Sequence, residues 1–332
     1  MRALVTGASG FIGGAVARAL LRRGADVRVL LRAGSVPNLP EAADVEVARG
    51  DLRDAQAVAA AARDCDAIFH VAALYSFGAP ASEVLAVNVG GTRNVVAAAR
   101  ESGARLVYTS SIATIGGMRN GTLPDELSTP VGPPPGPYKK SKWEAETLVR
   151  DEVASGGLDA VIVNPTFPVG VGDIKPTPTG AVIRDFLDGR IPAYVDTGMN
   201  VVDVDDVAQG HVLAFERGQR GERYILGHAN LTMRELLEEL AAVAGRKAPW
   251  IRLPHLIALG LAHADAFVEG RILRRPPRIP LEGVRTAREV MFANCSRARR
   301  ELGLRQTPIR EALAKAVRWF EERGRRGQRG AS

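Results

Sequence analysis

Cysteine, histidine, aromatic side chains and long apolar runs are all scarce in this chain of 332 residues. The two cysteines, Cys65 and Cys295, lie far apart, and neither they nor the five histidines show the spacing of a metal site, so we expect no metal. No apolar run is long enough to span a bilayer, and the sequence opens on a short apolar strand rather than on a charged and apolar leader. We therefore expect a cytoplasmic protein.

Positive charge is abundant but unevenly placed. The net charge of +7 suits an anionic ligand, yet much of the basic excess lies between Arg318 and Arg329. Because no aromatic residues interleave with the last arginines, a solvated tail is favoured over a nucleic-acid site. We expect residues 321–332 to be a disordered basic tail, and we predict no nucleic-acid partner.

Segments with the pattern of strands alternate with segments that have the pattern of helices. Strands are expected at residues 3–5, 27–31, 45–49, 67–72, 106–110 and 160–164, and helices at residues 11–22, 55–62, 83–102 and 138–155. This alternation predicts the α/β class, with a Rossmann doubly wound parallel sheet and a smaller C-terminal substrate-binding lobe. We assign residues 1–164 to a dinucleotide-binding domain to which residues 201–226 return, and residues 165–200 and 227–320 to the substrate lobe.

A glycine-rich turn follows the first expected strand. Gly7, Gly10 and Gly13 stand between that strand and an Ala/Leu-rich helix. Glycines let the backbone turn sharply and approach a pyrophosphate, and the helix N-terminus offers N–H donors and a positive dipole end. An ordinary strand-to-helix turn is the alternative, but the strand before and the helix after favour a dinucleotide cradle.

The ends of the second and third strands bear on the choice of cofactor. Arg32 stands where an arginine accommodates the 2′-phosphate of NADP and where an acidic residue would bind the ribose of NAD. NADP(H) is therefore favoured, NAD(H) is the alternative, and a solvated surface arginine is the other interpretation of Arg32. Asp51 and Leu52 are expected at the adenine. A rival role for Asp51 is to cap the helix that begins near Asp54.

Tyr138 and Lys142 are four residues apart and would share one face of a helix. A nearby ammonium stabilises phenolate and lowers the tyrosine pKa, so this pair can move a hydroxyl proton during hydride transfer. Ser111, after the fifth strand, would donate a hydrogen bond to the substrate oxygen. A chance Tyr/Lys pair on an exposed helix is the alternative, but the preceding serines favour catalysis.

Together these motifs resemble the extended short-chain dehydrogenase/reductase superfamily, in particular its NAD-dependent epimerase/dehydratase family. The resemblance covers essentially the whole chain and rests on TGASGFIG, Asp51-Leu52, HVAA, Asn88 with the following Val-Gly-Gly-Thr, YTSS and YKKSK. Later segments, including DIKPTPTG, are similar to the group of hopanoid-associated sugar epimerases, which itself resembles dihydroflavonol 4-reductases.

The resemblance implies roles for individual residues. Ser111, Tyr138 and Lys142 would form the catalytic triad, and Asn88 would be a supporting polar residue. The expected cofactor contacts are Gly7, Gly10, Phe11, Ile12, Gly13, Arg32, Asp51, Leu52, Ala72, Asn88 and Pro165. Substrate contacts are predicted at Lys175, Thr177 and Tyr194. Capping of a helix that begins near Gly180 is the alternative for Thr177, and packing on the sheet edge is the alternative for Tyr194.

The resulting prediction is an NAD(P)-dependent enzyme that acts on a sugar or polyol-type carbinol or ketone by tyrosine-assisted hydride transfer, as a sugar epimerase does. An NADPH-dependent ketone reductase of dihydroflavonol 4-reductase type is the alternative. A non-catalytic dinucleotide sensor is the alternative of another class, and the Ser/Tyr/Lys trio argues against it. Dehydration is disfavoured because the residues after Ser111, Ile112-Ala113-Thr114, supply no acidic partner.

Partners beyond a small-molecule substrate are predicted from helix surfaces. In the superfamily that the chain resembles, the helices at 83–102 and 138–155 pair across a two-fold axis, which implies a homodimer. Residues 253–262 are unusually apolar for a surface helix, so we interpret them as a lid or a packed helix. Weak contact with a membrane surface is the alternative, aided by Arg271, Arg274, Arg275 and Arg278. His70, at a strand end, is expected to pack near the cofactor.

Overall fold

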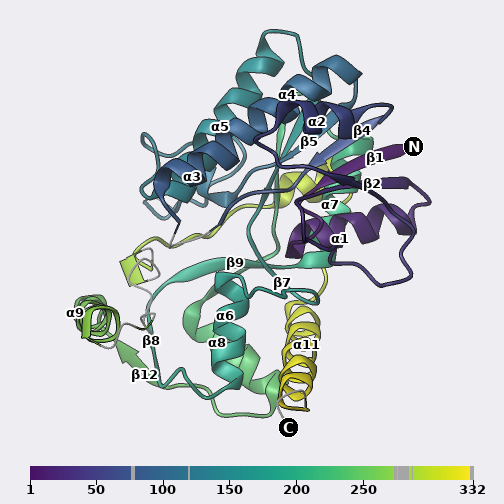
Figure 1. Ribbon diagram of the computed structural model, residues 1–332. Helices are drawn as coiled ribbons and strands as arrows, with labels where there is room; N and C mark the ends of the chain where they lie inside the picture. Colours follow the sequence, from purple (N-terminus) through teal and green to yellow (C-terminus); the bar gives the residue numbers. More distant parts are fainter. Residues whose placement is uncertain (76–78, 119, 273–274, 276–283, 286, 330–332) are drawn as a thin grey trace.

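The computed structural model describes residues 1–75, 79–118, 120–272, 275, 284–285 and 287–329. A seven-stranded, wholly parallel sheet forms its centre (Figure 1). Its strands, in sheet order, are β10 (Arg223–Leu226), β6 (Ala160–Pro165), β5 (Arg105–Thr109), β4 (Ala67–His70), β1 (Arg2–Thr6), β2 (Asp26–Leu31) and β3 (Glu46–Arg49). The predicted fold class, a doubly wound parallel sheet, is confirmed.

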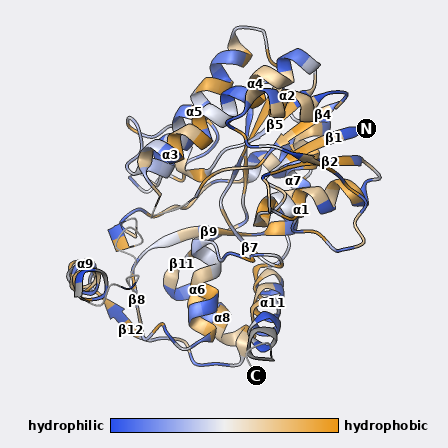
Figure 2. Cartoon of the chain, in the orientation of Figure 1, coloured by the Kyte–Doolittle hydropathy of each residue, from blue (hydrophilic) through white to orange (hydrophobic). Residues whose placement is uncertain are grey.

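Except at the edge strand β3, which is largely exposed, both faces of this sheet are buried, and this explains why most of its strands are nearly continuous apolar runs. Alternate side chains of β1 point to opposite faces: Val5 packs toward α1 (Phe11–Arg22) and α7 (Val204–Arg217), whereas Leu4 packs toward α2 (Ala55–Ala62), α4 (Gly91–Ser102) and α5 (Pro137–Ala154). Figure 2 shows these apolar strands between the two helical layers.

The smaller lobe lies beyond one end of the sheet (Figure 1). In it, β9 (Gly198–Asp203) pairs in parallel with β7 (Phe167–Val169) and antiparallel with β11 (Ala229–Thr232). Side chains of α6 (Pro178–Leu187), α8 (Met233–Ala244) and α11 (Ile309–Arg329) form its core. Thr232 and Glu235 form a capping box that starts α8. A further two-stranded sheet joins β8 (Ala193–Val195) and β12 (Ile251–Leu253). The division of the chain into domains at the predicted boundaries stays a prediction.

Three expected elements differ from the structure. The single helix expected at 83–102 consists of α3 (Ala81–Leu85), a π-helical turn η1 (Ala86–Gly90) and α4. The expected disordered tail continues α11 as far as Arg329, because Glu and Arg are good helix formers and Glu321 lies 3.7 Å from Arg325 one turn later. The apolar helix α9 (His255–Asp265) buries Ala258 and Ala262 but exposes Leu256, Ile257 and Leu261, so it is not a packed core helix.

The remaining described elements are short. They are the 3₁₀ turn η2 (Ile112–Thr114) and the π-helical turns η3 (Ala266–Ile272) and η4 (Ala298–Leu302). Among the described residues, no helix combines the length and apolar content needed to cross a bilayer.

Candidate active site

Most of the predicted cofactor residues follow the carboxyl ends of the parallel strands. The strand order reverses direction between β1 and β4, and in such sheets ligands bind in the crevice outside the strand ends at this switch point. Gly7 follows β1 and Ala72 follows β4, so the glycine turn lies at the switch point. The topology alone therefore places the expected cofactor cradle where a dinucleotide is bound in this architecture.

The geometry of the turn requires glycine at Gly7 and Gly13. Gly7 has a φ of +77°, and a Cβ on it would lie 2.7 Å from the backbone nitrogen of Ala72. A Cβ on Gly13 would lie 2.5 Å from the carbonyl carbon of Gly7 and closer still to its oxygen. The Gly10 N–H donates to the Gly7 carbonyl at 2.9 Å and closes the turn. The backbone is thus packed without side chains on the inner side of the turn.

Helix α1 begins at this turn with its N-terminal N–H groups available. Gly10 supplies no side-chain cap, and the first turn of α1, whose residues are all described, contains no acidic side chain. Phe11 is buried and anchors the helix to the sheet. Uncapped N–H donors and the positive end of the helix dipole suit a pyrophosphate. The turn therefore fits the dinucleotide expected from the sequence, with Gly7, Gly10, Phe11, Ile12 and Gly13 around it.

Arginines gather beyond the ends of β2 and β3. Arg32 is exposed at the end of β2, and the Arg49 guanidinium donates to the carbonyls of Arg32 and Ser35 at 3.2 and 2.6 Å. Asp51 accepts from Arg53, which holds the pKa of the Asp51 carboxyl at about 2. The helix cap that was a rival role for Asp51 is instead made by Asp54.

Leu52 and Pro165 flank the crevice from two strand ends. Leu52 is buried, and a Cβ on Gly91 would lie 2.9 Å from that of Leu52, so this leucine packs closely on the start of α4. Pro165 is the last residue of β6 and is buried. Both stand at the carboxyl edge of the sheet, as a residue that contacts a dinucleotide requires.

A buried hydrogen-bonded chain joins the glycine turn to α4. The two ring nitrogens of His70 lie 2.8 Å from the Thr6 hydroxyl and 3.0 Å from the Thr92 hydroxyl. Burial, with the charge of Lys142, lowers the pKa of His70 to about 3, so its ring is neutral. Ala72 N–H donates to Thr6 Oγ1 at 3.2 Å. His70 thus holds Thr6, the residue before Gly7, in place at the glycine turn. The sequence pattern did not indicate the partners Thr6 and Thr92.

Asn88 lies in the π-helical turn and is buried. Its amide exchanges bonds with Leu74, accepting from the Leu74 N–H at 2.7 Å, and donates to the Ser141 hydroxyl at 2.8 Å. Ser141 in turn donates to the Tyr138 carbonyl at 2.7 Å. Single π-helical turns within helices are frequent at functional sites. Here the turn aims Asn88 at the start of α5, which carries Tyr138.

Tyr138 and Ser111 meet at this point. Burial and the neighbouring Tyr75 raise the pKa of Tyr138 above its usual range, and they outweigh Ser111, which acts in the opposite direction. The ring of Tyr75 packs edge-on against that of Tyr138, with centroids 4.2 Å apart. The expected lowering of the Tyr138 pKa by Lys142 does not occur in this structure. Burial dominates, and Tyr138 is protonated at neutral pH.

Lys142 is buried one turn along α5. Its ammonium donates to the Thr109 carbonyl at 2.7 Å and lies 5.4 Å from the centre of the Tyr108 ring. Burial lowers the Lys142 pKa to about 8, while the carboxylate of Glu146 acts in the opposite direction. Glu146 was not among the residues predicted from the sequence, although its place four residues after Lys142 puts both on one helix face.

The three predicted substrate residues have different environments. Lys175 is exposed in the loop before α6. Thr177 caps α6, accepting from Gly180 N–H at 3.1 Å and donating to Asp173 at 2.8 Å, so the capping alternative describes its contacts. Tyr194 is buried among the core side chains of the smaller lobe. Its contacts are those of a core side chain rather than of a half-buried residue on a sheet edge, and its contact with a substrate stays a prediction.

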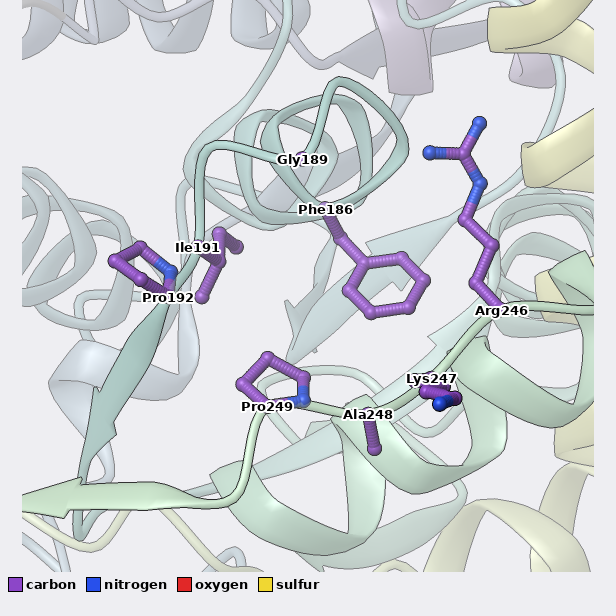
Figure 3. Close-up of a pocket in the computed structure, with 8 residues that line it drawn as sticks. All are labelled: Phe186, Gly189, Ile191, Pro192, Arg246, Lys247, Ala248 and Pro249. Carbon is purple, nitrogen blue, oxygen red and sulfur yellow. The ribbon is translucent and has the colours of Figure 1, made fainter.

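A hollow of about 290 Å³ lies elsewhere, at the ends of α6 and α8 in the smaller lobe. Figure 3 shows Phe186 and Pro249 on its wall, with Arg246 at one side. None of the predicted catalytic, cofactor or substrate residues lines this hollow. A catalytic site at the strand ends stays a prediction from the motifs.

Several known proteins are similar to this chain in sequence and in architecture. The model described as "NAD dependent epimerase/dehydratase family" matches residues 3–227. "Putative dihydroflavonol 4-reductase" of Synechocystis is 43% identical over 96% of this chain and 94% of that protein. "Sterol demethylase protein B" of Methylococcus capsulatus is 36% identical over 98% of this chain and 99% of that protein. The structure of Thermus thermophilus UDP-glucose 4-epimerase with NAD is 26% identical, with a TM-score of 0.75 over 97% of this chain and 99% of that one.

Proposed function

The chain belongs to the NAD dependent epimerase/dehydratase family of extended short-chain dehydrogenases/reductases, as its motifs predicted, and from this premise we propose that it is an NADPH-dependent ketone reductase. The carrying observation is Tyr138, whose pKa is raised by burial and by the neighbouring Tyr75, so that its side chain is a phenol at neutral pH. A protonated phenol is the form that donates a proton to a carbonyl oxygen. Two similar proteins, the putative dihydroflavonol 4-reductase of Synechocystis and a ketoreductase of Stigmatella aurantiaca, are named as reductases, and we therefore rank ketone reduction above the sugar epimerisation that ranked first from the sequence.

The residues have distinct roles in this proposal. A bound reduced nicotinamide would supply a hydride to the carbonyl carbon. Tyr138 donates its phenolic proton to the carbonyl oxygen, and Ser111 donates a hydrogen bond to the same oxygen as negative charge develops there. Lys142 holds a positive charge beside the forming phenolate. Asn88, through Ser141, fixes the first turn of α5 and so the position of Tyr138.

Epimerisation of a sugar or polyol is the second candidate, supported by the resemblance to UDP-glucose 4-epimerase. The two candidates differ in what happens to the cofactor, since an epimerase recycles a tightly held oxidised cofactor. Denaturing the purified protein and assaying the released nucleotide separates them. Retained NAD⁺ or NADP⁺ supports the epimerase, and an empty protein that consumes NADPH with a ketone supports the reductase. NADPH binding without turnover of any probe revives the non-catalytic sensor. A role in hopanoid biosynthesis stays a prediction.

Arg32 is proposed as the contact for the 2′-phosphate of NADPH. Because hydrogen bonds to charged groups contribute about 1.5–3 kcal/mol, Arg32→Ser is expected to weaken NADPH binding about 10- to 100-fold and to leave NADH binding unchanged. Fluorescence titration with both cofactors measures this. The matched control is Arg22→Ser, an exposed arginine at the far end of α1. Equal loss for both cofactors would contradict the assignment.

Contact with a membrane surface is proposed for α9 and the residues beside it. Trp250, Leu256 and Phe267 are 86%, 73% and 59% exposed, which is costly for large apolar side chains that meet only water. Arg271 and Arg275 are exposed nearby, whereas Arg274 and Arg278 lie outside the described residues. An apolar helix flanked by arginines suits the surface of anionic lipid.

Vesicles of phosphatidylglycerol and phosphatidylcholine test this contact. The protein is expected to co-sediment with them, and Leu256→Ser with Phe267→Ser to weaken the partition at least about tenfold. Leu127→Ser is the matched control, because Leu127 is 82% exposed and is not a residue of α9. Absence of co-sedimentation refutes the contact.

The predicted homodimer, paired through α4 and α5, is tested separately by sedimentation equilibrium, where a monomer at every concentration would refute it.

A further inference from the structure

A buried ion pair lies beneath the proposed catalytic residues. Glu146 on α5 and Arg223 on β10 have side chains only 5% and 7% exposed, with Glu146 Oε1 3.1 Å from Arg223 Nη1. The second guanidinium nitrogen of Arg223 donates to the carbonyls of Glu126 and Ser128. Arg223 thus ties α5 to the last strand of the sheet and to the loop that precedes α5.

The other oxygen of Glu146 is turned toward the segment that carries Ser111. Oε2 accepts from the hydroxyls of Ser110 and Thr114, which flank Ser111, and from the Asn164 amide at 3.0 Å. The Thr114 hydroxyl also lies 2.8 Å from the Ser111 carbonyl oxygen, and the Asn164 amide donates to that oxygen at 3.2 Å. Every described partner of Oε2 therefore lies on, or bonds to, the turn from Ser110 to Thr114.

A buried network of this kind adds little to the free energy of folding. Taking a carboxylate and a guanidinium out of water costs more than their attraction returns in many proteins, and an apolar pair of similar volume is often as stable. What the network provides is direction, because each charged or polar atom has a partner at a fixed angle. The atoms that it fixes are those around Ser111 and Lys142.

We propose that Glu146 is a positioning residue: its carboxylate, anchored by Arg223, holds the Ser110–Thr114 turn so that Ser111 faces Tyr138, and it keeps a negative charge one helical turn from Lys142. This proposal rests on the proposed function for its kinetic consequence only. The placement of the turn and the charge beside Lys142 are properties of the protein without substrate.

The electrostatic part of the proposal depends on the groups that face Lys142. They are Tyr138 and Glu146 on its own helix, the neutral His70 on β4, and the ring of Tyr108 with the Thr109 carbonyl on β5. Glu146 is the anion that raises the Lys142 pKa against burial. Activity that needs charged Lys142 is present below its pKa and is lost as the pH rises through it. Removing the Glu146 charge moves this loss to lower pH.

The experiment compares Glu146→Gln with wild type and with Glu152→Gln. Glu152 lies on the same helix and pairs with Arg100 at 2.8 Å, but at the surface, so it controls for loss of one carboxylate from α5. NMR titration of protein with ¹³C-labelled lysine gives the Lys142 pKa without substrate. Glu146→Gln is expected to lower it by about one unit, and Glu152→Gln to leave it unchanged.

The kinetic arm uses NADPH consumption with dihydroquercetin as the probe ketone. For Glu146→Gln we expect kcat to fall about 10- to 100-fold at unchanged NADPH affinity, with the alkaline limb of the pH profile shifted downward by about one unit. The proposal is overturned if Glu146→Gln leaves both the Lys142 pKa and the rate of amide hydrogen exchange at residues 110–115 unchanged. If wild type consumes no NADPH with any ketone, the reductase assignment fails, and the NMR arm still decides on Glu146.

Thr114→Val covers the case in which Glu146→Gln does not fold. It removes the hydroxyl that lies within hydrogen-bond distance of both Glu146 and the Ser111 carbonyl, and it leaves every charge in place. Amide hydrogen exchange at residues 110–115 is expected to accelerate at least about tenfold in this variant, with global stability measured alongside by urea unfolding. If the exchange accelerates only as much as the loss of global stability accounts for, the network does not hold the turn.

Discussion

Replacing Tyr138 by phenylalanine is expected to lower kcat for ketone reduction by about 10²- to 10⁴-fold, the contribution of a positioned proton donor. The variant loses one hydroxyl and keeps its ring. The edge-on contact with Tyr75 and the burial of the helix start are therefore preserved. NADPH affinity should stay within about twofold of wild type, because the cofactor cradle is built from β1, α1 and the strand ends. Stopped-flow measurement of NADPH oxidation, beside a fluorescence titration, separates the two quantities.

Tyr75→Phe is the matched control for this change. It removes a tyrosine hydroxyl from the same aromatic pair and leaves Tyr138 and Ser111 in place. Its kcat should remain within about threefold of wild type if the proton comes from Tyr138. An equal loss of kcat in the two variants would mean that the two rings serve only as packing at the site. The proton donor would then be another residue. Retained activity in Tyr138→Phe would refute the reductase mechanism directly.

The fold was predictable because its signals are local. Apolar runs such as residues 27–31, the turn from Gly7 to Gly13 and the alternation of periods require only neighbouring residues. The seven-stranded parallel sheet follows from that pattern and the handedness of its crossovers. The spacing of Tyr138 and Lys142 was also local, and the structure places both on one face of α5, near Ser111.

The electrostatics of the site were not predictable in the same way. From the sequence, Lys142 was expected to lower the Tyr138 pKa, yet burial raises it, and burial depends on elements distant in the chain. Glu146 meets Arg223 across 77 positions, and His70 meets Thr6 across 64. Thr177 shows the opposite case. Helix capping was the alternative role predicted for Thr177 from the sequence. A threonine before Pro178 at a helix start is a strong local signal for such a cap.

Substituting alanine for Gly13 is expected to weaken NADPH binding at least about tenfold and to lower the free energy of unfolding by about 1–3 kcal/mol, the usual range for overpacking. The atoms that a Cβ would meet are the carbonyl group of Gly7 and the nitrogen of Ala8, at 2.5 Å from the carbon and 3.0 Å from the nitrogen. These are backbone atoms in a closed turn and cannot swing aside as a flexible side chain does. The turn must open, and the N–H donors at the start of α1 move with it.

Gly260→Ala is the matched control, because Gly260 also lies inside a helix and a Cβ there meets nothing within 4 Å. Since alanine is the better helix former, this variant should be as stable as wild type or slightly more stable, with unchanged NADPH affinity. Urea unfolding and cofactor titration of both variants distinguish a general cost of helical glycine replacement from a specific one. If Gly13→Ala is destabilised but binds NADPH as wild type does, the cradle lies elsewhere. If both quantities fall together, the close packing at the switch point between β1 and β4 is what holds the pyrophosphate.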